Sequence, residues 1–221
     1  METQLGIVFT GGEGPEPQAI GRLLAGLETK ALIVAADCGL RLAESAGLSP
    51  DWIIGDMDSL DSENSLAQYP GERVVRHAAA KDYTDTELAL SLLWEKGCTD
   101  AWIIGGGGGR IDHLLGIRDL FERERFPRRW VTAAEDMHCI EGGGLTASVE
   151  QGSLASVFPL GGGPWKAESR GLKWPLDSVR WERGLYSLSN ESTGEQVSVS
   201  ARQGRFLVVF PGDRIYGINN T

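Results

Sequence analysis

The chain has 221 residues, of which 41% are hydrophobic and 24% charged, a composition typical of a globular protein with one large core or two modest ones. Its formal net charge of −10 argues against DNA and RNA as partners, because binding a polyanion needs a basic surface. The sequence shows no signal peptide, no run of membrane-spanning length and only three widely spaced cysteines, so we expect a cytoplasmic protein without membrane attachment or a disulfide framework.

Residues 1–135 alternate between short apolar runs and helical patterns. The apolar runs lie at 5–10, 31–37, 51–56, 73–77, 101–106 and 129–133, and the helix candidates at 16–28, 39–46, 84–96 and 110–125. The runs are rich in β-branched residues and mostly unalternating, as in strands buried on both faces. Thr84 and Glu87 fit a capping box, and Gly97 fits a helix stop. This order predicts an open, mainly parallel α/β sheet.

Helical patterns are absent from residues 136–221. Short apolar runs remain, separated by turns that contain Gly, Pro or Asn. Residues 196–201 alternate strictly between polar and apolar side chains, as in a half-exposed strand. The sequence therefore predicts two domains, an α/β domain at 1–135 and an all-β domain at 136–221 that forms a β-sandwich.

Carboxylates gather where the predicted strands end. The set comprises Asp56, Asp58, Asp82, Asp85 and Asp112. Because open α/β sheets bind ligands beyond the carboxyl ends of their strands, we expect these side chains to meet in one cleft. Two carboxylates about 4 Å apart repel by roughly 4 kcal/mol at an effective dielectric constant near 20, so the aspartates are either dispersed and solvated or they hold divalent cations. Oxygen ligands favour Mg²⁺, which bridges to substrate phosphates.

Simpler roles remain open for single aspartates. Asp85 is equally well explained as a helix cap that complements the helix dipole. Asp61 is better explained as a turn residue. Metal binding is favoured for Asp56, Asp58 and Asp82, because the Asp-x-Asp pair directly follows a buried strand.

Five consecutive glycines, residues 105–109, lie between a predicted strand and a predicted helix. Such a loop lets backbone N–H groups approach phosphate oxygens at a helix N-terminus, whereas a tight turn needs only one or two glycines. Arg110 stands where a Walker A motif has lysine, and its guanidinium is a candidate phosphate donor. For His113, ligand contact and packing are equally open. The segment 10–17 is a weaker candidate for the pocket wall, because Glu13 would repel phosphate.

Several motifs together resemble the thiamine pyrophosphokinase family. They are ADCGLRLAESAGLSPDWIIGDMDS (36–59), KDYTDTELAL (81–90), GGGGGRIDH (105–113), SRGLKWPL (169–176) and SLSNE (187–191). These motifs cover most of the chain and follow the order that is found in the family. The resemblance implies an α/β nucleotide-binding domain followed by a β-sandwich, and a homodimer with thiamine held near the interface. It also implies transfer of the pyrophosphoryl group of ATP to the hydroxyl of thiamine, giving thiamine diphosphate and AMP with Mg²⁺.

The resemblance and the motifs assign roles to named residues. The catalytic and metal-binding set is Asp56, Asp58, Asp82 and Asp85. The nucleotide-binding set is Lys81, Gly107, Gly108, Gly109, Arg110, Asp112 and His113. The thiamine-binding set is Trp174, Ser189 and Asn190, whereas Trp165 and Trp181 are expected to pack in the core.

The expected chemistry is positioning and charge neutralisation around an in-line attack. Asp58 or Asp85 is a candidate acceptor for the proton of the thiamine hydroxyl. Two other functions use the same residues: a metal-dependent phosphohydrolase without an acceptor, and a nucleotide or thiamine sensor without turnover. The motifs at 169–176 and 187–191 argue against the first, and the large acidic set argues against the second.

Overall fold

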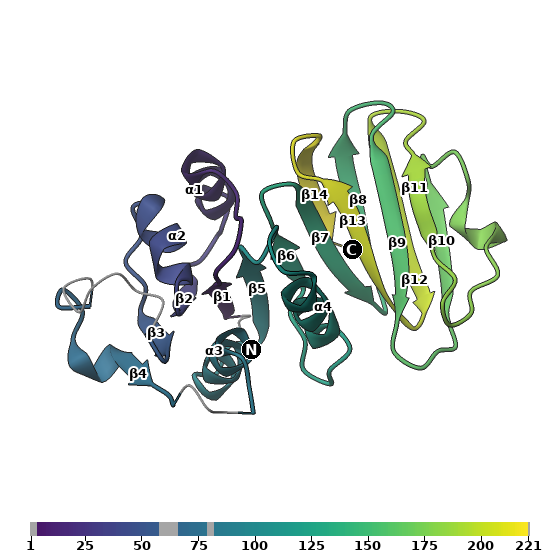
Figure 1. Cartoon of the computed structure of the whole chain (residues 1–221). Helices are drawn as coiled ribbons and strands as arrows, with labels where there is room; N and C mark the ends of the chain where they lie inside the picture. The colour runs from purple at the N-terminus through teal and green to yellow at the C-terminus, as the bar shows by residue number, and fades with distance from the viewer. Residues whose placement is uncertain (1–3, 58–65, 79–81, 221) are drawn as a thin grey trace. The chain divides into compact units, whose positions relative to one another are not determined.

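The computed structural model describes residues 4–57, 66–78 and 82–220 (Figure 1). Three residues named above, Asp58, Asp61 and Lys81, lie outside these ranges. The chain divides into two compact units. The α/β unit comprises Met1–Leu120 and Trp130–Ala133, and the β unit comprises Phe121–Arg129 and Ala134–Thr221. Among the described residues, no helix is both long and apolar enough to cross a membrane.

The α/β unit is built around a parallel sheet. Its strands are β1 (Leu5–Phe9), β2 (Leu32–Ala36), β3 (Trp52–Gly55), β4 (Val74–Arg76), β5 (Asp100–Ile104) and β6 (Arg129–Val131), the last of which begins in the β unit. The order is β6-β5-β1-β2-β3-β4, and the pairs from β5 to β4 are all parallel. Each of the six predicted runs therefore overlaps a strand.

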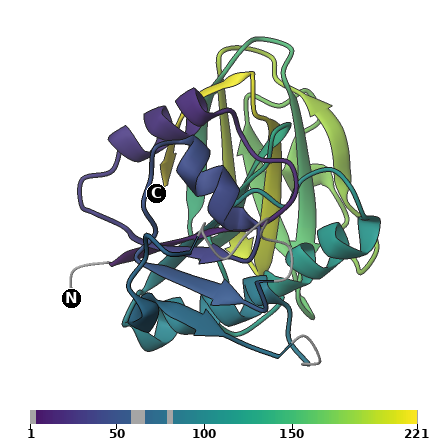
Figure 2. The same ribbon diagram turned by 60° about the vertical axis from the view of Figure 1, so that its left-hand side comes forward.

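Helices cover both faces of this sheet. They are α1 (Pro17–Ala25), α2 (Gly39–Ser45), α3 (Asp85–Glu95) and α4 (Ile111–Leu120), with a short 3₁₀ helix at Gly71–Arg73. Figures 1 and 2 show α1 and α2 on one side of the strands and α3 on the other. Ile7 of β1 and Ile20 of α1 share one core. On the opposite face, a Cβ at Gly6 would lie 2.6 Å from Leu93 of α3, so the glycine allows close helix packing.

The predicted capping box of α3 is confirmed. Thr84 Oγ1 accepts a hydrogen bond from Glu87 N at 3.3 Å, and Glu87 Oε2 accepts one from Thr84 N at 2.7 Å. Two otherwise unpaired N–H groups of the first turn are satisfied in this way. The start of α3, where one of the candidate carboxylates lies, is thereby fixed.

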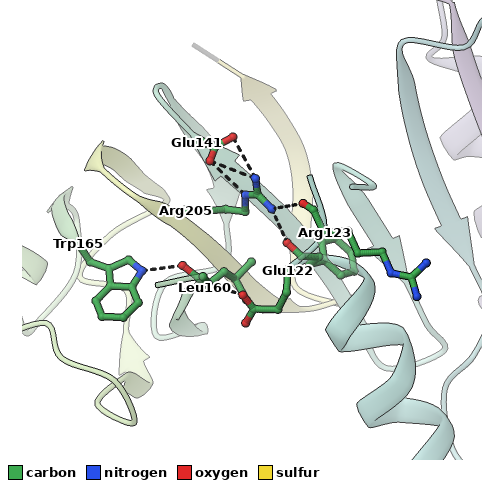
Figure 3. Close-up of polar contacts among 8 residues, drawn as sticks. Glu122, Arg123, Glu141, Leu160, Trp165 and Arg205 are labelled. Carbon is green, nitrogen blue, oxygen red and sulfur yellow. Dashed lines mark hydrogen bonds and ion pairs between the residues drawn. The ribbon is translucent and has the colours of Figure 1, made fainter. Parts of the chain in front are cut away.

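Helix α4 is shorter than the predicted 110–125, because the chain turns after Leu120. Arg205 of the β unit donates from Nη1 to the backbone carbonyls of Phe121 and Arg123, each at 2.8 Å, and also pairs with Glu141 (Figure 3). Its guanidinium lies 3.5 Å from the ring centroid of Phe126. A distant side chain, which no local pattern reveals, thus holds residues that were predicted to be helical.

The β unit contains two antiparallel sheets. Its strands are β7 (Glu135–Glu141), β8 (Gly144–Val149), β9 (Leu154–Leu160), β10 (Lys166–Arg170), β11 (Ser187–Glu191), β12 (Gln196–Gln203), β13 (Arg205–Pro211) and β14 (Ile215–Asn220). One sheet has the order β11-β9-β13-β7 and the other β10-β12-β8-β14. A 3₁₀ helix at Leu176–Ser178 packs beside β10.

Side chains from both sheets of the β unit form one hydrophobic core. Val157 of β9, Val199 of β12 and Phe206 of β13 belong to it. Trp165 and Trp181 pack against this cluster, which confirms their predicted structural role. Trp165 Nε1 also donates to Leu160 O at 2.6 Å (Figure 3).

A buried ionic cluster lies at the start of the β unit. Arg129 donates to both carboxylate oxygens of Asp136, at 2.9 and 2.5 Å, and His138 Nε2 lies 2.8 Å from Asp136 Oδ1. Burial raises the pKa of Asp136, but the contacts with His138 and Arg129 outweigh this effect and lower its pKa to about 2. Burial also lowers the pKa of His138, against the opposing effect of Asp136. The cluster is therefore a pH-sensitive part of the structure.

Candidate active site

Three carboxylates meet at the carboxyl end of the parallel sheet. Asp37 directly follows β2, Asp56 directly follows β3, and Asp85 is the first residue of α3. Each offers an oxygen, and these three oxygens lie within 4.8 Å of one another. All three residues are half-buried. We call Asp37, Asp56 and Asp85 the carboxylate cluster.

One backbone and one side-chain hydrogen bond hold the elements that carry the cluster. Asp37 adopts a positive φ of 45°, and its N–H donates to Ile54 O at 2.9 Å, so the turn after β2 is tied to β3. The buried hydroxyls of Thr10 and Thr86 lie 2.6 Å apart and join the end of β1 to the first turn of α3. The carboxylates are therefore positioned by elements of the sheet and by one helix N-terminus.

The carboxylate cluster fits a hard divalent cation. Two charges 4.8 Å apart repel by roughly 3 kcal/mol at an effective dielectric constant of 20, and a bound cation would offset this repulsion. Asp37 Oδ1 is buried and accepts no hydrogen bond from the described residues. A buried oxygen without a donor is costly unless a ligand satisfies it. The donor set is oxygen only, which suits Mg²⁺.

The structure brings together part of the predicted acidic set. Asp56 and Asp85 lie in the cluster, whereas Asp82 is exposed and outside it. Asp58 lies outside the described residues. Sequence reasoning missed Asp37, although the same signal, an aspartate directly after a buried strand, was present in the run 31–37.

The glycine run divides into two parts. Gly105, Gly106 and Gly107 are buried, and their N–H groups donate to Val131 O, Gly11 O and Glu13 O, each at 2.9 Å. Gly108 and Gly109 are exposed and adopt φ values of 63° and 64°. The N–H of Gly107 is thus engaged within the chain, and Gly108 and Gly109 are the two glycines of the run whose backbone is exposed.

Alanine substitutions in the buried and exposed parts of the glycine run should lower the free energy of unfolding by different amounts. Gly105→Ala should lower the free energy of unfolding by about 3 kcal/mol, because φ is 100° and the new Cβ would lie 2.3 Å from Thr10 O. Gly109→Ala should cost only about 1 kcal/mol, since its φ is positive but no atom lies within 4 Å of its Cβ. Urea unfolding of both variants measures the difference, and equal losses would contradict this division of the loop.

Arg110 and Asp112 form a bidentate ion pair at the start of α4. Arg110 Nε donates to Asp112 Oδ1 at 3.1 Å, and Nη2 donates to Oδ2 at 2.5 Å. The hydrogen bond between them raises the pKa of Arg110 and lowers the pKa of Asp112. Both side chains are exposed, so the pair orients the guanidinium more than it stabilises the fold. His113 is also exposed, which removes core packing as its role.

The residues predicted to bind thiamine lie on or beside β11 in the β unit. Trp174 is 55% exposed, and Ser189 is exposed with a φ of 53°. Asn190 is buried, and its amide is hydrogen-bonded within the chain. Lys173 Nζ lies 5.0 Å from the ring centroid of Trp174 and 2.8 Å from Glu191 Oε2. The Trp174 ring and the Glu191 carboxylate therefore both contact a cation, the ammonium group of Lys173.

Two family models match the chain. The catalytic domain of thiamin pyrophosphokinase matches residues 25–128, and the vitamin B1 binding domain of thiamin pyrophosphokinase matches residues 145–206. The chain belongs to the thiamine pyrophosphokinase family. The predicted resemblance is confirmed, and the enzyme class of the family, thiamine diphosphokinase, applies to the chain.

Relatives of the thiamine pyrophosphokinase family support this assignment. Thiamine pyrophosphokinase from Bacillus subtilis (strain 168) is 25% identical over 184 residues, which are 80% of this chain and 86% of the relative. A crystal structure of a family protein from Enterococcus faecalis is 27% identical, with a TM-score of 0.72 over 96% of this chain and 100% of that one. The structure of the Bacillus subtilis enzyme has a TM-score of 0.75 at 23% identity and covers 95% and 99% of the two chains.

Proposed function

We propose that the chain transfers the pyrophosphoryl group of ATP to the hydroxyl of thiamine in an Mg²⁺-dependent reaction, with the α/β unit as the nucleotide-binding domain. The carboxylate cluster carries this proposal, because its three oxygens and the unsatisfied Asp37 Oδ1 fit a divalent cation at the ligand-binding edge of the sheet. When bound, the cation offsets the charge of the phosphates.

Other residues of the α/β unit position the nucleotide. Gly108 and Gly109 offer exposed backbone at the start of α4, and Arg110 offers a guanidinium that Asp112 holds in one orientation. Asp85 is the described candidate for accepting the proton of the thiamine hydroxyl, because it belongs to the carboxylate cluster. On the resemblance alone, Asp58, Lys81, Asp82 and His113 complete the proposed site.

We assign thiamine binding to the β unit, whose two sheets we interpret as a sandwich because they share one core. The exposed ring of Trp174 suits the flat, cationic substrate, and Glu191 adds a negative charge beside it. Ser189 is exposed next to this position. Thiamine, which is a cation, would therefore bind against the Trp174 ring, the same ring that Lys173 contacts in the structure.

We also propose a homodimer with the thiamine site near its interface. Leu185, Tyr186 and Leu188 are exposed in and just before β11, which ends the β11-β9-β13-β7 series of strands. Large apolar side chains that gather on an edge strand are typical of interaction surfaces. A second copy of the chain is the partner that the resemblance implies.

The deciding experiment incubates the purified protein with ATP, Mg²⁺ and thiamine and identifies every product. We expect AMP and thiamine diphosphate in equal amounts. ADP with thiamine monophosphate would contradict pyrophosphoryl transfer. Phosphate or pyrophosphate released without thiamine would indicate the phosphohydrolase, and binding without turnover would indicate the sensor.

A further inference from the structure

Asn190 uses its whole side-chain amide inside the protein. Oδ1 accepts hydrogen bonds from Trp174 N at 3.1 Å and from Glu191 N at 3.0 Å. Nδ2 donates to Trp174 O at 2.6 Å and to Ser187 Oγ at 3.3 Å. An asparagine amide has two donors and two acceptor lone pairs, so its hydrogen-bonding capacity is filled. Because the residue is also 1% exposed, it presents no free polar group to a ligand.

These bonds continue a strand-like pairing between β11 and the segment Gly171–Trp174. Lys173 N donates to Glu191 O, and Thr193 N donates to Gly171 O, each at 2.9 Å. At Trp174, the side chain of Asn190 takes over the role of a backbone peptide group and binds both the N–H and the C=O. Pro175 follows and has no N–H to extend the pairing.

We propose that Asn190 is a positioning residue for the thiamine site: it fixes the backbone of Trp174 and does not itself touch the substrate. The proposal rests on the proposed function. Trp174 is 55% exposed, so packing alone does not set the direction of its ring. The two hydrogen bonds with Asn190 and the contact with Lys173 restrain this residue.

A double-mutant cycle separates positioning from direct contact. Thiamine binding is measured by calorimetry for the wild type, Asn190→Ala, Trp174→Ala and the double variant. We expect Asn190→Ala to weaken thiamine binding roughly tenfold, since it removes both restraints on Trp174. In the Trp174→Ala background the same change should have no further effect on affinity, and the KM for ATP should stay constant throughout. An equal loss in both backgrounds would overturn the proposal and make Asn190 a direct ligand.

Two further variants guard against a general loss of structure. Ser198→Ala removes one hydrogen bond, to Thr146, elsewhere in the β unit and should leave the affinity for thiamine unchanged. Asn190→Asp keeps the acceptor for Trp174 N but places a second carboxylate oxygen where Nδ2 lay 2.6 Å from Trp174 O, so the two oxygens repel and thiamine binding should weaken at least as much as in Asn190→Ala. Wild-type affinity for thiamine in Asn190→Asp would contradict the assigned geometry.

A spectroscopic measurement keeps this proposal separate from the proposed function. The wild type and Asn190→Asp are each compared with the same protein carrying Trp174→Phe. The difference in fluorescence within each pair gives the signal of Trp174 without that of the other six tryptophans. Acrylamide should quench this signal more strongly in Asn190→Asp than in the wild type, because the ring is less restrained. If the wild type binds no thiamine, the proposed function fails, while unchanged quenching would overturn the positioning role itself.

Discussion

Asp37→Asn should lower kcat by on the order of 100- to 1,000-fold, because it removes one charged oxygen from the carboxylate cluster. The same change should raise the thermal midpoint of the metal-free protein by about 2–4 °C, since solvent screening leaves roughly 1 kcal/mol of the repulsion to be relieved. Asparagine tolerates the positive φ of this position, so backbone strain does not confuse the result.

The measurement compares product formation and thermal unfolding with and without Mg²⁺. Wild-type protein should be stabilised by Mg²⁺, whereas Asp37→Asn should respond much less. Asp119→Asn is the matched control, because Asp119 is an exposed aspartate of the same unit that pairs with Arg118. Normal activity together with a normal Mg²⁺ response in Asp37→Asn would remove this residue from the metal site.

Asp136→Asn should lower the free energy of unfolding at pH 7 by about 3 kcal/mol, because it removes the negative charge of a buried ion pair with Arg129. The loss should also change the response to acid. The pKa of Asp136 falls to about 2 from an ordinary 3.8, and so its stabilising contribution of about 2 kcal/mol is present above pH 4 and is lost as the pH falls towards 2.

His138 adds to the acid sensitivity in the same direction. Its pKa is lowered from 6.5 by burial, so the folded protein binds fewer protons than the unfolded chain, and stability declines as the pH falls below 6.5. Urea unfolding between pH 7 and pH 2 should give a flatter curve below pH 4 for Asp136→Asn than for the wild type. Parallel curves would show that Asp136 does not carry the acid response.

Local patterns were sufficient for most of the α/β unit. Unalternating apolar runs located each strand, and the spacing of Thr84 and Glu87 located the first turn of α3. The position of Asp56 and Asp85 at one sheet edge followed from the parallel order of the strands. These features depend on residues that are close in sequence or on a general property of parallel sheets.

Other features depend on contacts between distant residues, which no local pattern contains. The end of α4 is set by Arg205, and Asn190, which the sequence suggested as a ligand, is bonded to Trp174 16 positions away. Gly107 looked available for phosphate, but its N–H is bonded to Glu13 O. In each case the sequence does not show which distant residue forms a hydrogen bond with the polar group.

The hydrogen bonds from Arg205 to the turn after α4 affect the order in which the chain folds. Arg205 and Phe121 are 84 positions apart, so the restraint on Phe121 and Arg123 cannot form until β13 has been synthesised. During synthesis on the ribosome, the parallel strands of the α/β unit are complete in sequence up to β5 long before that point. The turn after α4 therefore acquires its final conformation late, and a chain truncated before residue 205 would leave it without its tether.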